Sequence, residues 1–310
     1  MTKSLRAELL IVLTLTFGIS GVRAVLNLIN SLAAPQRLDE QSVTLNSSQS
    51  SLAWVDMGLQ LCSAAVLFSY GALALFLLAK DRFVPRAHRA RDWLEGAGLA
   101  ALIGIPGLAL YVAAVQLGWS KEVIPGDFAN AWVDMGLQLC SAAVLFSYGA
   151  LALFLLAKDR FVPRAHRARD WLEGAGLAAL IGIPGLALYV AAVHLGWSKE
   201  VIPGDFANAW VEIPVSLLKA AANAFAEETV VVMWLMTRLR QARWSLPATL
   251  AASSILRGSY HLYQGVSAGF GNIIMGLIYG YYYHRTGRVW PLVIAHFLID
   301  AVAFVGYSFL

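Results

Sequence analysis

The chain has 310 residues, of which 59% are apolar or aromatic and only 14% are charged, and its mean hydropathy is +0.64. An ordinary soluble domain is about one quarter charged, so this composition excludes a soluble globular protein, and its abundance of apolar residues excludes intrinsic disorder. A membrane span needs roughly 20 apolar residues. Dividing the apolar and aromatic residues, 59% of 310, by this length predicts about nine transmembrane helices. We assign the net charge of +4 to loops at an anionic membrane surface and expect no nucleic-acid partner.

Part of this length is an internal copy. Residues 53–130 recur as residues 131–208 with one difference, Gln116 against His194. The predicted fold is therefore all-α, a polytopic transmembrane helical bundle of seven spans plus a duplicated two-helix hairpin. Its four segments are an N-terminal span with an outer loop (1–52), the first hairpin copy (53–130), the second copy (131–208) and a C-terminal helical region (209–310).

The apolar runs alternate with two kinds of linker. In chain order the runs are 8–31, 53–79, 97–117, 131–157, 175–195, 213–236, 246–265, 267–283 and 290–309. Lys and Arg cluster before the first run and after the second, fourth, sixth and eighth runs, whereas the other linkers lack such clusters. Because basic loops stay in the cytoplasm, the pattern predicts a multi-pass membrane protein with a cytoplasmic N-terminus and an outside C-terminus. We expect it in a bacterial cell membrane.

Ionisable side chains within membrane spans are costly and usually functional. The ionisable side chains that lie well inside predicted spans are concentrated in the last hundred residues. They are Glu227 and Glu228 in the sixth run, Arg257 and His261 in the seventh, and His296 and Asp300 in the ninth. The members of the last two pairs are four residues apart, so each pair shares one helix face. At about 1.5 Å per residue, Glu228 and His296 lie at similar depths, whereas His261 counts as too deep unless its helix bends or its linker lies at the interface.

Two interpretations of this cluster remain open. In the first, it is a polar network that braces three helices, with a glutamate paired with Arg257 and His296 paired with Asp300. In the second, a carboxylate or imidazole takes a proton from water while other donors stabilise an oxyanion. Glutamate and histidine also bind zinc, so Glu227, His261 and His296 could hold a divalent metal, although the HExxH signature is absent.

In type and order, these residues resemble the CPBP or Abi family, which comprises CAAX-type prenyl endopeptidases and bacteriocin-processing intramembrane proteases. The EExxxR motif of the family matches at Glu227 and Glu228, and its FxxxH motif matches at His261. Its HxxxN or HxxxD motif matches at His296 and Asp300. The resemblance covers residues 209–310.

The resemblance implies an intramembrane endopeptidase that hydrolyses a peptide bond. Glu227 would act as general base with His261 assisting, His296 and Asp300 would hold or orient the oxyanion side, and Glu228 would be structural or would tune Glu227. The family is described with both metal-dependent and glutamate-dependent mechanisms. The implied partners are the lipid bilayer and a peptide or protein substrate at the membrane, with or without an attached lipid.

The chain departs from the family motifs at three positions. Val232 stands at the arginine position of the first motif, and Arg257 stands at the phenylalanine position of the second. The third motif ends in Asp300 rather than in asparagine. We hypothesise that Arg257 supplies the missing guanidinium from the facing helix and pairs with Glu228. The departures leave room for a catalytically inactive relative that binds or scaffolds a membrane partner. A further alternative, independent of the departures, is a small transporter that uses the cluster as a proton or ion path.

Overall fold

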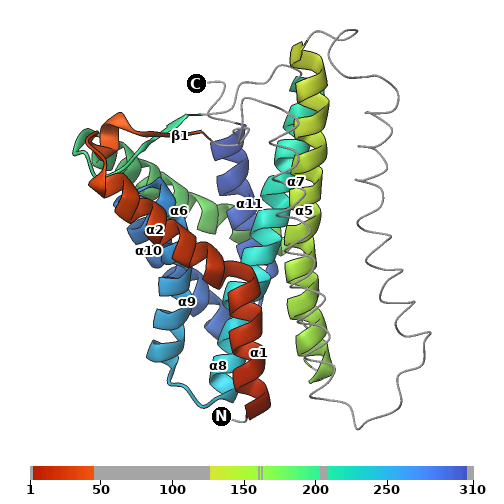
Figure 1. Ribbon diagram of the computed structural model, residues 1–310. Helices are drawn as coiled ribbons and strands as arrows, with labels where there is room; N and C mark the ends of the chain where they lie inside the picture. Colours follow the sequence, from red (N-terminus) through yellow and green to blue (C-terminus); the bar gives the residue numbers. More distant parts are fainter. Residues whose placement is uncertain (1–2, 45–125, 160, 162, 203–208, 306–310) are drawn as a thin grey trace, which may run out of the picture. The chain divides into compact units, whose positions relative to one another are not determined.

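The computed structural model describes residues 3–44, 126–159, 161, 163–202 and 209–305, and these are almost entirely helical, as predicted (Figure 1). The chain divides into two compact units. The first comprises residues 1–47, 142–205 and 216–310, and the second comprises residues 48–141 and 206–215. All six ionisable residues singled out above belong to the first unit. The predicted spans 53–79 and 97–117 lie outside the described residues, and the predicted four-segment division stays a prediction.

Long helices alternate with short helical turns and two short strands along the described residues. In chain order they are α1 (Lys3–Leu13), η1 (Thr14–Gly18), α2 (Ile19–Ala33), η2 (Leu38–Glu40), β1 (Ser42–Thr44), α5 (Gly126–Lys158), α6 (Arg169–His194), β2 (Glu200–Ile202), α7 (Ala209–Glu227), η3 (Glu228–Trp234), α8 (Leu235–Gln241), α9 (Leu246–His261), η4 (Leu262–Gln264), α10 (Val266–Thr286) and α11 (Trp290–Phe304). Strands β1 and β2 form a short parallel pair that the apolar runs did not predict.

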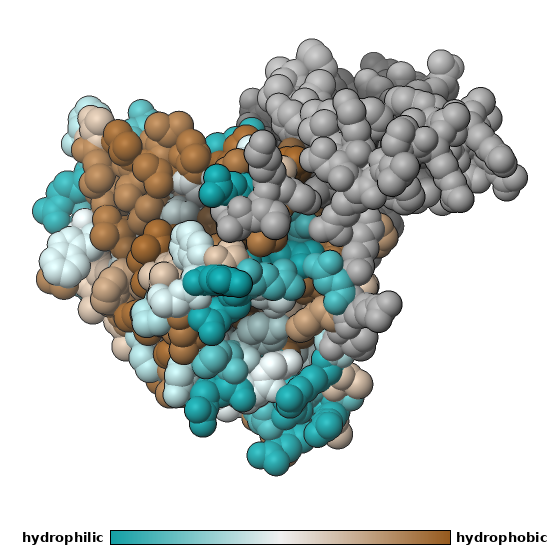
Figure 2. Space-filling view, turned by 90° about the horizontal axis from the view of Figure 1, so that it is seen from below, coloured by the Kyte–Doolittle hydropathy of each residue, from teal (hydrophilic) through white to brown (hydrophobic). Residues whose placement is uncertain are grey.

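Two helical stretches of the described chain are long and apolar enough to cross a membrane, Leu5–Ala33 and Arg169–His194. Ser141–Ala157 and Trp290–Phe304 are shorter apolar helices. Large apolar side chains along α2 and α6 are exposed, among them Leu26, Leu172 and Ile183. Brown apolar surface accordingly covers part of the face in Figure 2, while hydrophilic side chains gather elsewhere on it. An exposed apolar surface of this kind suits contact with lipid, and the number of nine spans stays a prediction.

Helix α9 packs against α8 and, more extensively, against α10, and the ends of α9 and α10 carry clear start and stop signals. Ser245 caps α9 by accepting a hydrogen bond from the backbone N–H of Ala248, at 3.3 Å. Gly287 ends α10 in the left-handed conformation, with φ of 63°. Between α9 and α10 the backbones approach closely, because a Cβ on Gly276 would lie 2.9 Å from the Cα of Ser254.

The N-terminal run is bent, and its first half is tied to α8. The backbone of buried Thr16 leaves the helical region between α1 and α2, with φ of −113° and ψ of −111°. Before this bend, buried Glu8 accepts hydrogen bonds from the Arg238 guanidinium at 2.6 Å and from the indole N–H of Trp234 at 3.2 Å. Arg238 also contacts Asp159. Figure 1 shows α1 beside α8 at the end of the molecule where the N-terminus lies.

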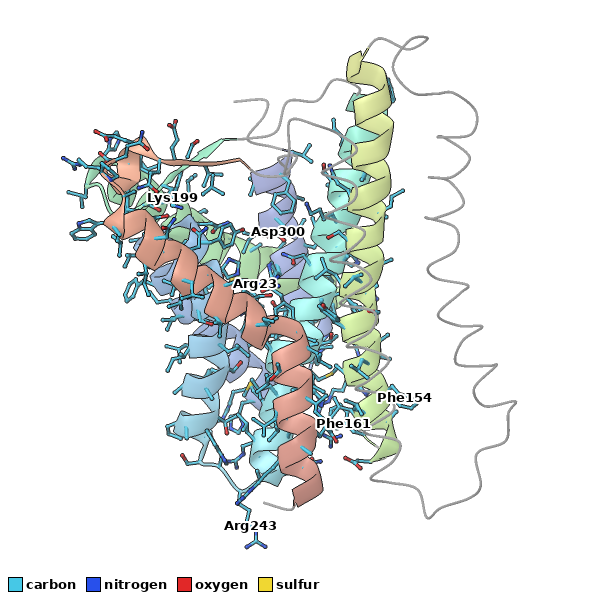
Figure 3. All side chains as sticks on the ribbon, viewed as in Figure 1. Arg23, Phe154, Phe161, Lys199, Arg243 and Asp300 are labelled. Carbon is cyan, nitrogen blue, oxygen red and sulfur yellow. The ribbon has the colours of Figure 1, made fainter. Side chains whose placement is uncertain are left out.

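The two kinds of linker lie at opposite ends of this unit. Arg243, in the basic turn between α8 and α9, extends away from the helices at one end, and Lys199, in the linker before β2, lies at the other (Figure 3). The turn between α10 and α11 carries Arg288, which pairs with Asp170 and Glu173 at the start of α6. This arrangement agrees with the alternation of basic and non-basic linkers along the sequence.

Candidate active site

The paired glutamates lie where helix α7 gives way to the π-helical segment η3. Glu227 is the last residue of α7 and Glu228 is the first of η3, and both are buried, at 2% and 0% exposed. Short π-helical segments within α-helices are frequent at functional sites. Because adjacent helical residues point about 100° apart, the two carboxylates face different neighbours.

His261 lies at the level of the glutamates, contrary to the depth count from the basic residues. Helix α8 continues past Arg238 to Gln241, so Glu227 is about 21 Å along the helix axis from that end. Helix α9 starts only at Leu246, after a non-helical turn, so His261 is about 22 Å from its start. When depth is measured from the ends of the helices instead of from the basic residues, Glu227 and His261 therefore lie at nearly the same depth.

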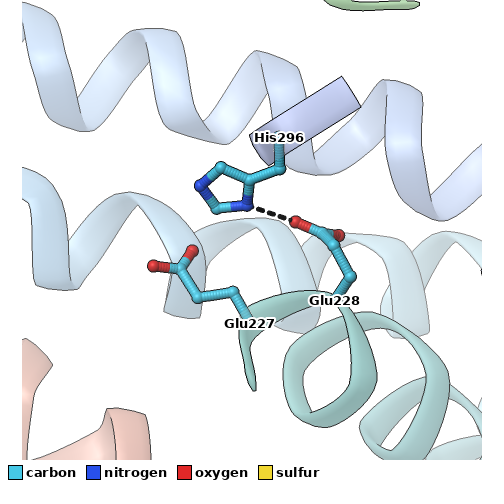
Figure 4. A group of neighbouring side chains, drawn as sticks. All are labelled: Glu227, Glu228 and His296. Carbon is cyan, nitrogen blue, oxygen red and sulfur yellow. Dashed lines mark hydrogen bonds and ion pairs between the residues drawn. The ribbon is translucent and has the colours of Figure 1, made fainter. Parts of the chain in front are cut away.

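Glu228 is held by one helix on each side. The Arg257 guanidinium on α9 donates to its Oε1 atom at 2.6 Å, and Nδ1 of His296 on α11 lies 2.7 Å from the same oxygen (Figure 4). Arg257 is 0% exposed and His296 is 3% exposed. The hypothesised pairing of Arg257 with Glu228 is thus present. Val232 is buried in η3, and Arg257 places a guanidinium against the paired glutamates from the facing helix.

The nearest polar contacts of Glu227 come from α9, and one of them, Arg257, is shared with Glu228. The Tyr260 hydroxyl donates to its Oε2 atom at 2.6 Å. The Arg257 guanidinium lies 3.6 Å from this oxygen, and Nε2 of His261 lies 3.8 Å from it. The second distance is too long for a hydrogen bond, but the hydrogen bonds of catalytic pairs are often long before substrate binds. The carboxylate of Glu227 and the imidazole of His261 therefore lie side by side, close enough to act on the same bound water or substrate atom.

The third motif forms a polar chain on α11. Nε2 of His296 lies 3.6 Å from Oδ1 of Asp300, and Oδ2 of Asp300 accepts a hydrogen bond from the Asn223 side chain at 3.1 Å. Because Nδ1 of His296 is close to Glu228, the imidazole bridges the two carboxylates of Glu228 and Asp300. Asp300 lies among the helices in Figure 3. Of the two pairings expected for a structural brace, Arg257 with a glutamate is a close contact of 2.6 Å, whereas His296 lies 3.6 Å from Asp300. The closer partner of His296 is Glu228, at 2.7 Å, a contact that was not expected.

Several buried polar atoms around the glutamates have no hydrogen-bond partner within the described part of the chain. They are Oε2 of Glu228, Nε of Arg257 and both ring nitrogens of His261. Buried polar groups are nearly always paired, and each exception calls for an explanation. A polar ligand or water would satisfy these atoms, so the unpaired capacity gathers where a reacting group would bind.

The donor atoms for a metal ion meet here, but their surroundings oppose one. Ligand atoms of Glu227, Glu228 and His296 lie within 4.8 Å of one another. The Arg257 guanidinium, however, lies 2.6 Å from Glu228 and 3.6 Å from Glu227 and already provides their counter-charge. A cation in the same place would face this buried positive charge, and its ligand Glu228 is already bonded twice. The residues present therefore fit a metal poorly.

Two residues of the site were missed in the sequence. Tyr260 directly precedes His261, and Asn223 precedes Glu227 by one helical turn. The spacing of four residues within an apolar run was a usable signal for Asn223. Tyr260 offered no such signal, since tyrosine is common among buried apolar residues.

The chain matches a known family over the same residues that form the site described above. Residues 208–302 match the model of the family described as Type II CAAX prenyl endopeptidase Rce1-like. No curated protein and no solved structure matches the chain. The matched region contains every residue of the site described above, from Asn223 to Asp300. The C-terminal third of the chain is therefore similar to the Rce1-like CAAX prenyl endopeptidases of the CPBP family, which confirms the resemblance seen in the sequence.

Proposed function

We propose that this protein is an integral membrane endopeptidase that hydrolyses a peptide bond with a water molecule activated by Glu227. The carboxylate of Glu227 takes one proton from water, and the resulting hydroxide attacks the carbonyl carbon of the substrate. The C–N bond then breaks, and the proton passes to the departing amine nitrogen, with His261 assisting the transfer. The family match supports a protease, and the buried carboxylate beside an unpaired imidazole supports this mechanism.

The observation that carries the proposal is the different environment of the two glutamates. Glu228 accepts from both Arg257 and His296, so its negative charge is already used in holding three helices together. Glu227 has one close donor, Tyr260, and faces the unpaired ring of His261. When two neighbouring carboxylates have environments this different, they suit different roles. We assign Glu227 to proton transfer and Glu228 to support of the site.

We assign His296 and Asp300 to the oxyanion side. With Nδ1 donating to Glu228, the opposite nitrogen of His296 faces Asp300. Protonated on both nitrogens, the ring would donate from Nε2 to the oxygen of the tetrahedral intermediate. Asn223 holds Asp300 and so fixes the position of the carboxylate that balances this charge.

The proposed substrate is a peptide or protein segment at the membrane, including one that carries a prenylated CAAX-type terminus. The lipid bilayer is the second partner, and the exposed apolar faces of α2 and α6 would lie against it. We place the N-terminus in the cytoplasm, because Arg238 and Arg243 lie at the end of the molecule where α1 begins.

The test is cleavage of quenched fluorescent peptides by protein purified in detergent. The panel contains a farnesylated CAAX peptide, the same peptide without the lipid, and unrelated apolar peptides. We expect cleavage by the wild type and a loss of at least about 100-fold in Glu227→Gln and in His261→Ala. Cleavage retained by both variants would refute the assignment. If the wild type cleaves nothing, the inactive relative that binds a membrane partner becomes the better interpretation.

A chelator arm separates the two mechanisms. Because the Arg257 guanidinium already places a positive charge against the paired carboxylates, we propose that the reaction needs no bound metal. Dialysis against EDTA and 1,10-phenanthroline should then leave the rate unchanged within about twofold, well below the tenfold that 1.36 kcal/mol represents. Loss of activity on chelation with recovery on added zinc would show that the guanidinium moves aside for an ion.

A further inference from the structure

The geometry assigns Tyr260 as a positioning residue for Glu227, the residue that fixes the rotation of its carboxylate and so the direction in which its free oxygen faces. This inference rests on the proposed function. Tyr260 lies outside the three motifs, and its only polar contact among the described residues is the hydrogen bond of 2.6 Å to Oε2 of Glu227.

The two oxygens of Glu227 differ in their neighbours. Oε2 is the atom approached by Tyr260 at 2.6 Å, by Arg257 at 3.6 Å and by His261 at 3.8 Å. Across the described residues, no hydrogen bond reaches Oε1. When one oxygen of a carboxylate is held by a hydrogen bond, the group cannot rotate about its Cγ–Cδ bond without breaking that hydrogen bond. The other oxygen therefore keeps one direction. Oε1 is thereby left as the proton acceptor.

Tyr260 can hold this atom because its ring is itself fixed. It is 7% exposed and packs against Phe17 with ring centroids 5.0 Å apart, and against His261 with centroids 4.8 Å apart. Phe17 follows the backbone bend at Thr16, and a Cβ on Gly21 would lie 2.4 Å from the Ser259 hydroxyl, so α2 passes directly over this part of α9. The N-terminal segment thus supports the ring that aligns the general base.

The test is Tyr260→Phe, which removes one oxygen and keeps the ring and its packing. Tyr283→Phe is the matched control, because Tyr283 is also buried, at 8% exposed, and no contact joins it to the paired glutamates or to Arg257 in the described part of the structure. With the peptide that the wild type cleaves best, we expect kcat to fall about 10- to 100-fold in Tyr260→Phe, with KM within about twofold. The Tm in detergent should fall by only a few degrees, as expected for the loss of one buried hydrogen bond, and the control variant should retain wild-type kcat.

A pH profile separates positioning from loss of structure. The charged groups facing Glu227 are Arg257 and His261 on α9, His296 and Asp300 on α11, and adjacent Glu228, and all are unchanged in Tyr260→Phe. The Tyr260 hydroxyl stabilises the ionised carboxylate of Glu227, and the variant lacks this donor. The acidic limb of the kcat/KM profile should therefore move to higher pH. Wild-type kcat and an unmoved profile in Tyr260→Phe, with Glu227→Gln inactive, would overturn this inference alone. Retained cleavage in Glu227→Gln would instead overturn the proposed function.

Discussion

Replacing Arg257 by methionine tests whether its guanidinium is the counter-charge of the paired glutamates. The side chain is completely buried, 2.6 Å from Glu228 and 3.6 Å from Glu227. At an effective dielectric constant near 20, a charge pair at the shorter distance attracts by about 6 kcal/mol before desolvation is subtracted. His296 remains beside Glu228 in the variant and retains part of this stabilisation. Breaking a buried pair on one side typically costs about 3–5 kcal/mol, and we expect Arg257→Met to lie in that range.

The assay is equilibrium unfolding of the purified protein in detergent, with SDS as the denaturant. Arg243→Met is the control, because Arg243 extends away from the helices and should cost less than about 0.5 kcal/mol (Figure 3). The double variant Arg257→Met with Glu228→Gln removes the unpaired charge as well. It should be more stable than the sum of the two single losses by at least about 1 kcal/mol. Additive losses, or an Arg257→Met protein as stable as the control, would refute the reasoning.

Two predictions concern the frame of the site. Gly276→Val should destabilise the protein by about 1–3 kcal/mol in the same unfolding assay, because its Cβ would lie 2.9 Å from the Cα of Ser254 and force α9 and α10 apart; a stable variant would show that these helices can separate freely. Glu8→Ala should cost about 1–3 kcal/mol, because it removes the buried acceptor of Trp234 and of Nε of Arg238, although Arg238 keeps its contact with Asp159. In the latter case, Glu8→Gln should recover part of the loss by still accepting a hydrogen bond, and equal losses in the two variants would contradict an electrostatic origin.

The polar residues of three apolar runs were enough to single out the cluster whose side chains the structure brings together. Charged side chains are so costly in an apolar helix that Glu227, His261 and His296 stood out without knowledge of their neighbours. Helical spacing also showed that His296 and Asp300 share one face, and the structure places their side chains 3.6 Å apart. These inferences succeeded because they depend on one helix at a time.

The partners across helices were decided only by the tertiary structure. Glu227 and Glu228 are adjacent, so either could have faced Arg257, and the rotation of η3 against α9 gave the shorter contact to Glu228. Tyr260 carried no signal in the sequence, because its role comes from a hydrogen bond to a residue 33 positions away.

The amino-acid sequence was enough to predict an apolar, helical chain that gathers its buried ionisable residues in its last third. Composition and periodicity are local properties, and they suffice for those conclusions. Only packing between helices could show that Glu228 pairs with Arg257, that Oε2 of Glu227 lies near Tyr260 and His261 while Oε1 stays open, and that Glu8 of the N-terminal helix binds Arg238. The physical reason is that burial and charge pairing depend on how helices rotate and pack against one another, and residue spacing along one helix carries no information about its neighbours.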